Sequence, residues 1–93
     1  MPNRTRHSAV ILRLKRKKKP IDPREEPFNV AFGMRLKDAR EESRLSQARL
    51  SERLGIGYHQ YKKYEYGRPF PIYLLRDLAS ILDKPLSWLL SGR

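Results

Sequence analysis

The sequence predicts an all-α domain of five short helices that follows a basic N-terminal arm. Apolar residues recur at helical spacing from about residue 29 onward, and glycines at 55 and 57 separate two short amphipathic segments. Residues 1–27, in contrast, combine prolines with a dense run of positive charge. We therefore divide the chain into an arm and linker, residues 1–27, and a helical domain, residues 28–93.

The composition indicates an anionic partner. The 93 residues include 21 Lys and Arg against 10 Asp and Glu, a formal charge of +11, and such a field favours nucleic acid or an acidic membrane. The absence of cysteine excludes thiolate zinc sites, and two distant histidines do not suggest a metal cage. No run approaches the roughly 20 apolar residues of a membrane span. We expect a soluble, cytoplasmic, nucleoid-associated protein with no membrane partner, metal or cofactor.

The arm carries most of its charge in one cluster. Like charges at successive positions disfavour compact structure, so we expect a largely flexible segment that binds phosphates without sequence preference. The candidate phosphate contacts are Arg13, Lys15, Arg16, Lys17, Lys18 and Lys19. Alternating Val10, Leu12 and Leu14 leave open that the arm becomes ordered on a partner.

The first helix is expected from an Asn29 cap to about residue 43, with Phe32, Leu36 and Ala39 facing inward. Gly33 inside this helix costs about 1 kcal/mol relative to Ala and therefore suggests close backbone packing. The next helix begins at a Ser46 cap, and its end is expected at 55, where glycine can adopt a left-handed conformation.

The third helix begins after Gly57, ends at Gly67 and has two different faces. At about 100° per residue, Tyr61 and Tyr64 fall on the core side, while the opposite side is exposed and basic. A fourth helix is expected with Pro71 in its first turn and a leucine stripe as far as Leu82. A last short helix carries Leu86, Trp88, Leu89 and Leu90.

These residues together resemble the lambda-repressor-like, or XRE-type, helix-turn-helix family over about residues 32–92. The resemblance is carried by an ordered set rather than by one motif: Gly33, Arg40, Leu45, Ser46, Gln47, Leu50, Leu54, Gly55, Ile56, Tyr64, Glu65, Gly67, Pro71, Leu78, Ala79, Trp88, Leu89 and Leu90. It implies five short helices, with helix 58–66 in the major groove of DNA and the preceding helix across the backbone.

The resemblance also implies roles for individual residues. Gln47 corresponds to a glutamine that contacts phosphate and braces the recognition helix, and Arg68 to another phosphate contact. Arg40 and Glu65 correspond to an ion pair between the first and third helices. By the same resemblance, the residues expected to meet base edges or nearby phosphates are Tyr58, His59, Gln60, Lys62 and Lys63.

Four residues depart from the family pattern. Arg44 and Asp83 stand where glycine is common. Either the backbone at Arg44 adopts a left-handed conformation without glycine or this corner differs, whereas Asp83 tolerates the left-handed conformation fairly well. Ser51 replaces a common alanine, and Gly57 replaces the usual Ser or Thr cap. None of these departures changes the fold assignment.

The favoured function is sequence-specific binding of double-stranded DNA by a transcription regulator, which we expect to be a repressor that binds a pseudo-palindromic operator as a homodimer. The candidate dimer contacts are Phe70, Trp88, Leu89 and Leu90, although Trp88 and Leu89 can equally close the core. Two alternatives are an antitoxin or regulator whose arm folds on another protein, and a charge-driven nucleic-acid binder. An enzyme is disfavoured, because no catalytic set can be assembled.

Overall fold

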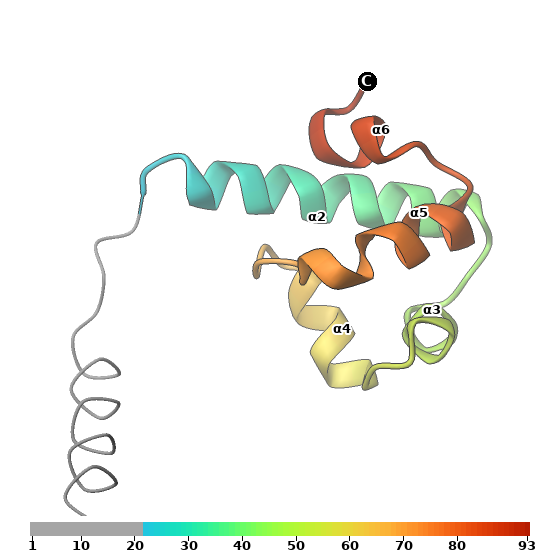
Figure 1. The fold of residues 1–93 in the computed structure, drawn as a ribbon. Helices are drawn as coiled ribbons and strands as arrows, with labels where there is room; N and C mark the ends of the chain where they lie inside the picture. The colour runs from blue at the N-terminus through green and yellow to red at the C-terminus, as the bar shows by residue number, and fades with distance from the viewer. Residues whose placement is uncertain (1–21) are drawn as a thin grey trace, which may run out of the picture.

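The computed structural model describes residues 22–93 as a helical domain (Figure 1). Its elements are α2 (Glu25–Glu42), α3 (Gln47–Leu54), α4 (Tyr58–Glu65), a short 3-10 helix η1 (Ile72–Leu74), α5 (Leu75–Leu82) and α6 (Leu86–Ser91). The prediction of an all-α domain with five α-helices is confirmed, and residues 22–93 contain no strand. The six basic arm residues named above as phosphate candidates lie outside the described residues.

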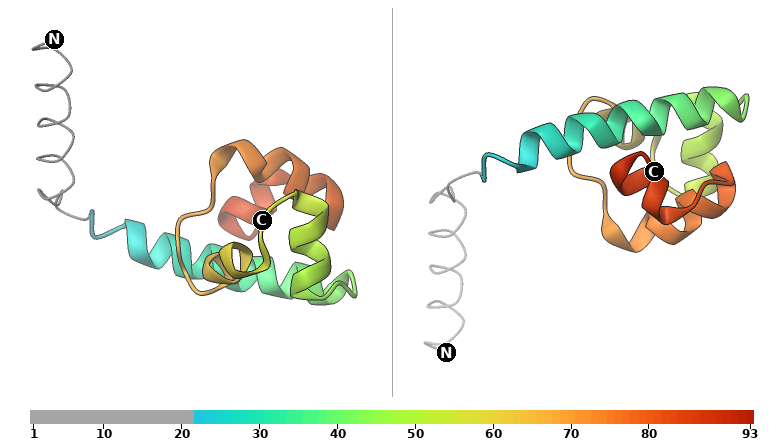
Figure 2. Two further views of the ribbon diagram at one scale, coloured as in Figure 1. Left: turned by 90° about the horizontal axis from the view of Figure 1, so that it is seen from below. Right: turned by 90° about the horizontal axis from the view of Figure 1, so that it is seen from above.

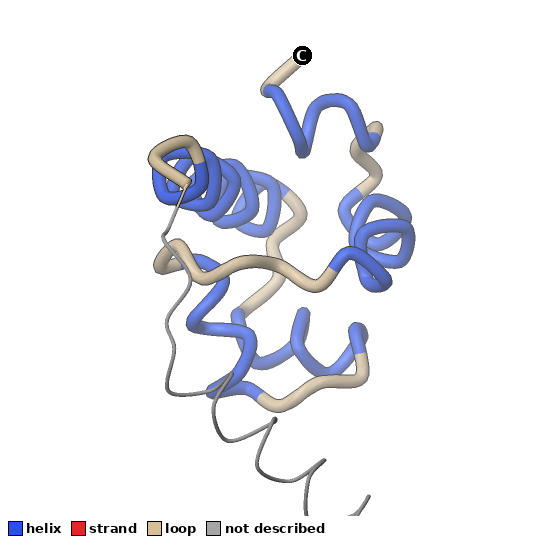
Figure 3. Tube along the Cα trace, turned by 60° about the vertical axis from the view of Figure 1, so that its left-hand side comes forward, coloured by secondary structure: helices blue, strands red, loops and turns tan. Residues whose placement is uncertain are grey.

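Every α-helix contributes to one core. α4 and α6 both pack on the long helix α2, α3 packs on α4 and α5, and α5 packs on α6, so the helices surround a common centre (Figures 2 and 3). The largest fully buried side chains come from all five helices and are Leu36, Leu50, Tyr61, Leu78, Leu82 and Leu89. Because no helix can bury its apolar face alone, the core fixes how α4 is presented.

The start of α2 was predicted too late. The helix begins at Glu25, one turn before the expected Asn29 cap, and its first residue donates its backbone N–H to the carbonyl of Asp22 at 2.9 Å. Pro27 is compatible with this turn because the first N–H groups of a helix have no intrahelical partner. The negative charges of Glu25 and Glu26 also interact favourably with the positive N-terminal end of the helix dipole. The proline that suggested a linker therefore lies inside the helix.

Two corners of the fold use left-handed residues other than glycine. Arg44 (φ 61°), between α2 and α3, and Asp83 (φ 53°), between α5 and α6, adopt the conformation expected from their positions. The chain can then reverse in a short loop at each corner. The departures at these positions therefore change the residue type without changing the backbone course.

The segment before α5 differs in detail from the prediction. Pro71 precedes the 3-10 helix η1, and α5 begins only at Leu75. Pro71 has an extended backbone (ψ 127°) and accepts a hydrogen bond from the N–H of Leu74. The proline thus starts a tighter turn that leads into α5, rather than forming part of that helix.

The C-terminal helix is held to α2 by an arginine. Arg35 donates from Nε to the carbonyl of Leu89 at 2.8 Å and from Nη2 to the carbonyl of Leu90 at 2.9 Å. The last carbonyl groups of a helix have no intrahelical partner, so a cation that binds them stabilises this end. The role of Arg35 was not predicted from the sequence, because its acceptors are main-chain carbonyl groups, which every residue has.

Candidate nucleic-acid interface

The corner between α3 and α4 is defined by local backbone chemistry. The Ser46 hydroxyl accepts the N–H of Arg49 at 3.0 Å and caps α3, and Gly55 ends α3 in the left-handed conformation (φ 76°). Gly57 then precedes α4 with an extended backbone. All three were predicted, and together they set the angle between the two helices.

Ser51, the polar residue in place of a common alanine, is buried in α3. Its hydroxyl donates to the carbonyl of Ala48 at 2.7 Å, so the buried oxygen is hydrogen-bonded. A satisfied hydroxyl of this size causes little packing change. The departure is therefore accommodated within α3 and does not alter the interface.

The inner face of α4 fixes the direction of its outer face. Tyr61 is fully buried and Tyr64 is 8% exposed, as their spacing predicted. α2 approaches α4 so closely at Gly33 that a β-carbon there would lie 2.7 Å from the carbonyl oxygen of Tyr64. The interpretation of Gly33 as a close-packing residue is confirmed. Since backbone packs on backbone here, α4 has little freedom to rotate.

A polar network ties the end of α4 to α2 and α3. Arg40 Nε lies 2.6 Å from Glu65 Oε2, and the two side chains are 10% and 5% exposed. Glu65 also accepts from Gln47 Nε2 at 2.9 Å and from the Tyr61 hydroxyl at 2.5 Å. Arg40 Nη1 donates to the carbonyl of Leu45 at 2.9 Å. The pair named from the sequence is thus the centre of a network linking three helices.

The network sets the protonation states of its members. Burial raises the pKa of Glu65, but hydrogen bonds from Arg40, Tyr61 and Gln47 outweigh it and hold the pKa below its usual range. Burial, and then the hydrogen bond to Glu65, raise the pKa of Tyr61 far above its usual range. Glu65 is therefore an acceptor and Tyr61 a donor at neutral pH.

The predicted base-reading residues share the outer face of α4. Tyr58, His59, Gln60 and Lys63 are exposed, and Lys62 is half-buried. Lys62 Nζ lies 5.2 Å from the centre of the Tyr58 ring, a cation–π distance that draws the lysine along the helix surface. Lys63 thus reaches solvent more directly than Lys62.

The electrostatic balance of this face is positive. Glu65, the acidic residue of α4, is neutralised by Arg40, whereas Lys62 and Lys63 have no acidic partner within salt-bridge distance among the described residues. Arg68 is exposed immediately beyond the helix. A convex surface of this kind suits a polyanion.

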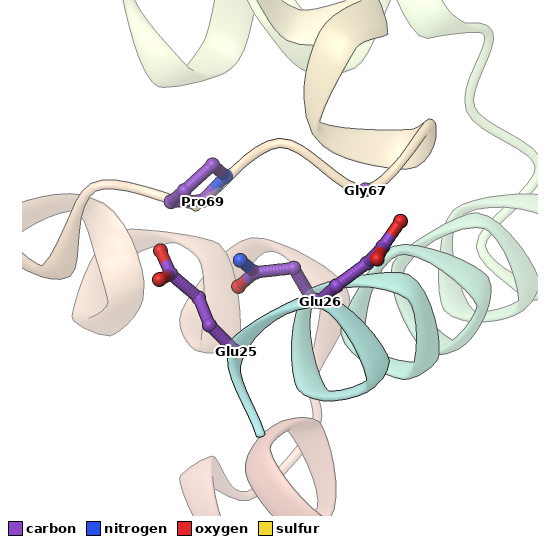
Figure 4. Close-up of a pocket in the computed structure, with 5 residues that line it drawn as sticks. Glu25, Glu26, Gly67 and Pro69 are labelled. Atoms are coloured by element: carbon purple, nitrogen blue, oxygen red, sulfur yellow. The ribbon is translucent and has the colours of Figure 1, made fainter. Parts of the chain in front are cut away.

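A pocket beside this surface has the opposite charge. It encloses about 240 Å³ between the start of α2 and the segment after α4, and is lined by Glu25, Glu26, Asn29, Gly67 and Pro69. Figure 4 shows the two glutamates facing the segment that contains Gly67 and Pro69. Two carboxylates disfavour a phosphate there, so the convex face of α4, not this pocket, is the candidate site.

The predicted phosphate contacts divide into two groups. Gln47 is half-buried at the start of α3, and one hydrogen of its Nε2 group is engaged by Glu65, which leaves the second available. Arg68 is exposed and its backbone N–H donates to the carbonyl of Lys63. Both border α4, whereas the arm candidates are outside the described residues.

The predicted dimer contacts are not equivalent. Leu89 is fully buried and belongs to the core, and Phe70 packs between Phe32 and Tyr64 at ring-centre distances of 5.4 and 5.1 Å. Trp88 is partly buried beneath Lys84, whose Nζ lies 4.7 Å from its ring. Leu90 is 40% exposed. Leu89 is therefore unavailable to a partner, and Leu90 is the most accessible candidate.

Two exposed apolar side chains were not among the predicted site residues. Ile72 and Tyr73, in η1, are 81% and 74% exposed. They follow the proline-framed segment, where periodicity carries no information about orientation. The only sequence signal that could have indicated them is that two large apolar residues follow Pro69 and Pro71 and precede a predicted helix.

Residues 22–93 contain no group of three or more side chains arranged to hold a metal ion. Among these residues, no helix is both long enough and apolar enough to cross a membrane.

The fold and this face define a helix-turn-helix protein: α3 and α4 meet at a glycine corner, and α4 presents polar side chains outward from a braced position. The helix-turn-helix family model matches residues 36–89. The chain belongs to this family, in its lambda-repressor-like, or XRE-type, branch, as the sequence resemblance predicted.

Two curated relatives come from Bacillus subtilis (strain 168). The uncharacterized HTH-type transcriptional regulator YqaE is 37% identical over 62 residues, 66% of this chain and 53% of the relative. The SPbeta prophage-derived uncharacterized HTH-type transcriptional regulator YonR is 40% identical over 62 residues, 66% of this chain and 57% of the relative. The chain thus spans about half the length of these relatives.

Proposed function

We propose that the protein is a transcription regulator that binds double-stranded DNA sequence-specifically, with α4 in the major groove and α3 across the backbone. The observation that carries this proposal is the braced outer face of α4. Tyr58, His59, Gln60 and Lys63 are exposed, while Arg40, Gln47 and Tyr61 hold the end of the same helix through Glu65. A fixed set of donors and acceptors is what base recognition requires.

The side chains of this face have distinct chemistries. Gln60 offers an amide suited to adenine, and Lys63 offers donors for guanine O6 and N7 or for phosphate. Lys62, drawn against the Tyr58 ring, is better suited to phosphate. Gln47 and Arg68, on either side of α4, are the phosphate contacts that would set its register.

A homodimer on a pseudo-palindromic site is the arrangement we propose, acting as a repressor in the cytoplasm. One domain of this size contacts few base pairs, and two copies related by a two-fold axis double the sequence read. Half-sites should be spaced by about 34–36 Å, one turn of DNA, or by a multiple of it. Leu90 and Trp88 are the candidate contacts between copies.

Selection of bound fragments from random double-stranded DNA tests the proposal. A consensus with two-fold symmetry supports a specific dimer, and Gln60→Ala and Lys63→Ala should each change the preferred bases at a defined position. Lys37→Ala, which removes an exposed charge from α2, is the matched control and should leave the consensus unchanged. If both α4 variants weakened all sequences equally and no site were preferred, binding would be charge-driven and the proposal would fail.

A further inference from the structure

Gln60, one of the exposed residues of α4, forms a side-chain hydrogen bond within residues 22–93. Its Nε2 donates to the hydroxyl of Tyr64, one turn later on the same helix, at 2.8 Å. An unrestrained glutamine at the surface samples several rotamers, and ordering it costs free energy on binding. The bond to Tyr64 orders the amide before DNA arrives.

Tyr64 is itself buried and is held by two neighbours, Gly33 and Phe70. Its side chain is 8% exposed, its backbone carbonyl faces Gly33 of α2 at close range, and its ring meets the Phe70 ring edge-on at 5.1 Å. Phe70 in turn lies against Phe32, with ring centres 5.4 Å apart. The Tyr64 hydroxyl is therefore a fixed point at the border between the core and the outer face of α4.

The bond leaves a defined set of groups on Gln60. A glutamine amide has one carbonyl acceptor and two N–H donors, and Tyr64 uses one of the donors. The remaining acceptor and donor are the pair that complements N6 and N7 of adenine in the major groove. In the orientation observed, with Nε2 directed at Tyr64, the amide presents the acceptor and the donor that adenine requires, whereas the flipped amide, accepting from the hydroxyl, would present two donors.

We propose that Tyr64 is a specificity-determining positioning residue: its hydroxyl orients the Gln60 amide so that α4 reads adenine at one position of each half-site. This inference rests on the proposed function and adds to it a residue that does not touch DNA. Tyr64 acts through Gln60, because its own side chain is buried in the domain.

The test uses Tyr64→Phe in the full chain, which removes the hydroxyl and keeps the ring in the core. Tyr73→Phe, which removes a hydroxyl from a 74% exposed residue outside α4, is the matched control. Competition titrations compare the selected DNA site with versions that carry each other base pair at each position. Tyr64→Phe, Gln60→Ala, the double variant and Tyr73→Phe are measured alongside the unmodified protein.

We expect Gln60→Ala to abolish the adenine preference at one position per half-site. Tyr64→Phe should reduce the preference at that same position by about three- to tenfold, the effect of one hydrogen bond. Affinity for non-specific DNA, the other positions and the Tyr73→Phe titration should be unchanged. The double variant should be no worse than Gln60→Ala, because the hydroxyl has no other route to the base.

A second measurement does not depend on the variant folding. In the unmodified free protein, the NMR order parameter of the Gln60 side-chain amide should exceed about 0.6, the upper range of flexible groups. A value as low as that of a flexible surface side chain would overturn the proposal.

The remaining outcomes separate this inference from the proposed function. An unaltered preference in Tyr64→Phe, or an equal loss at every position, would overturn the positioning role while leaving sequence-specific binding intact. If Lys63→Ala changes a base preference and Gln60→Ala changes none, the positioning role of Tyr64 is likewise overturned and sequence-specific binding remains. If the unmodified protein selects no site, both proposals fail.

Discussion

Arg40 and Glu65, 25 residues apart in sequence, form a side-chain ion pair at 2.6 Å between α2 and the last turn of α4. The carboxylate is shared with Gln47 and Tyr61, so one acidic group holds three helices together. Because both charges are largely removed from water, the pair is sensitive to the loss of either partner.

Replacing Arg40 with Ala should lower the free energy of unfolding by about 3–5 kcal/mol, because the Glu65 carboxylate is left buried without its cation. Arg49→Ala is the control, since Arg49 and Glu52 form an ion pair whose side chains are 64% and 70% exposed, and this loss should be within about 1 kcal/mol. Urea denaturation measures both. Equal losses in the two variants would mean that the buried network does not support the fold.

Gly33→Ala should destabilise the protein by about 1–3 kcal/mol, although alanine favours helices over glycine by about 1 kcal/mol. The added carbon would lie 2.7 Å from the Tyr64 carbonyl oxygen and 2.8 Å from that of Glu65, and neither backbone group can move freely. Gly57→Ser is the comparison: its β-carbon meets nothing within 4 Å, and serine is a good N-cap. Thermal denaturation should show a lower Tm only for the first variant, and a raised Tm in Gly33→Ala would contradict the packing.

The lowered pKa of Glu65 predicts a specific acid dependence. A carboxylate whose folded pKa lies below its unfolded value of 4.5 contributes stability that is present above pH 4.5 and lost as the pH falls through the folded pKa. The difference in unfolding free energy between the unmodified protein and Glu65→Gln should therefore be constant near neutral pH and shrink below 4.5. Denaturation curves from pH 7 to pH 3 measure it, and a constant difference over that range would disprove the linkage.

Two neighbouring leucines of α6 should respond differently. Leu89→Ala empties a fully buried position and should cost about 2–5 kcal/mol of stability. Leu90→Ser, at a 40% exposed position, should leave unfolding of the single chain within about 0.5 kcal/mol but weaken the proposed dimer. Sedimentation equilibrium measures the association, and an unchanged dimer constant in Leu90→Ser would remove this leucine from the interface.

Deleting residues 1–20, which contain eight Lys and Arg residues, should make DNA binding less dependent on salt. Each lost phosphate contact reduces the slope of log affinity against log salt concentration by about 0.9. A chain of full length with Arg13, Lys15, Arg16, Lys17, Lys18 and Lys19 replaced by Gln separates charge from length. If neither variant changes the slope, the arm does not contact DNA.

The domain was predictable where local chemistry and periodicity agree. Ser46, Gly55 and Gly57 define their helix ends by capping and backbone conformation, which depend on neighbours in sequence. The buried faces of α2 and α4 were likewise predicted from the spacing of their apolar residues. The two prolines were assigned wrongly in opposite directions, because a proline is acceptable both in a first turn and in a loop. Pro27 was assigned to a linker but lies in the first turn of α2, and Pro71 was assigned to the first turn of a helix but precedes η1.

The candidate site was only partly accessible from sequence. The outward positions of Tyr58, His59, Lys62 and Lys63 on α4 follow from the helix period. The place of Gln60 among the base-reading candidates and the Arg40–Glu65 pair were implied by the family resemblance. The hydroxyl of Tyr64 has no such signal, since its spacing identifies only a core ring, and its bond to Gln60 depends on the rotamers of both. The role of Arg35 also has no signal in the sequence, because its acceptors are main-chain carbonyl groups of a helix that is distant in sequence.

The position at which α2 begins determines where the preceding residues are attached to the domain. Glu25 and Glu26 share a pocket with Gly67 and Pro69, directly after α4, so the residues at the start of α2 lie beside the C-terminal end of the proposed recognition helix. Once α4 is on DNA, any group connected to this end of α2 is held near the duplex, and a tethered group can reach local concentrations on the order of millimolar. We predict that phosphate contacts of residues 1–20 that are too weak to form in free solution would then be occupied, and that they would lengthen the residence of the domain on DNA without contributing to the choice of sequence.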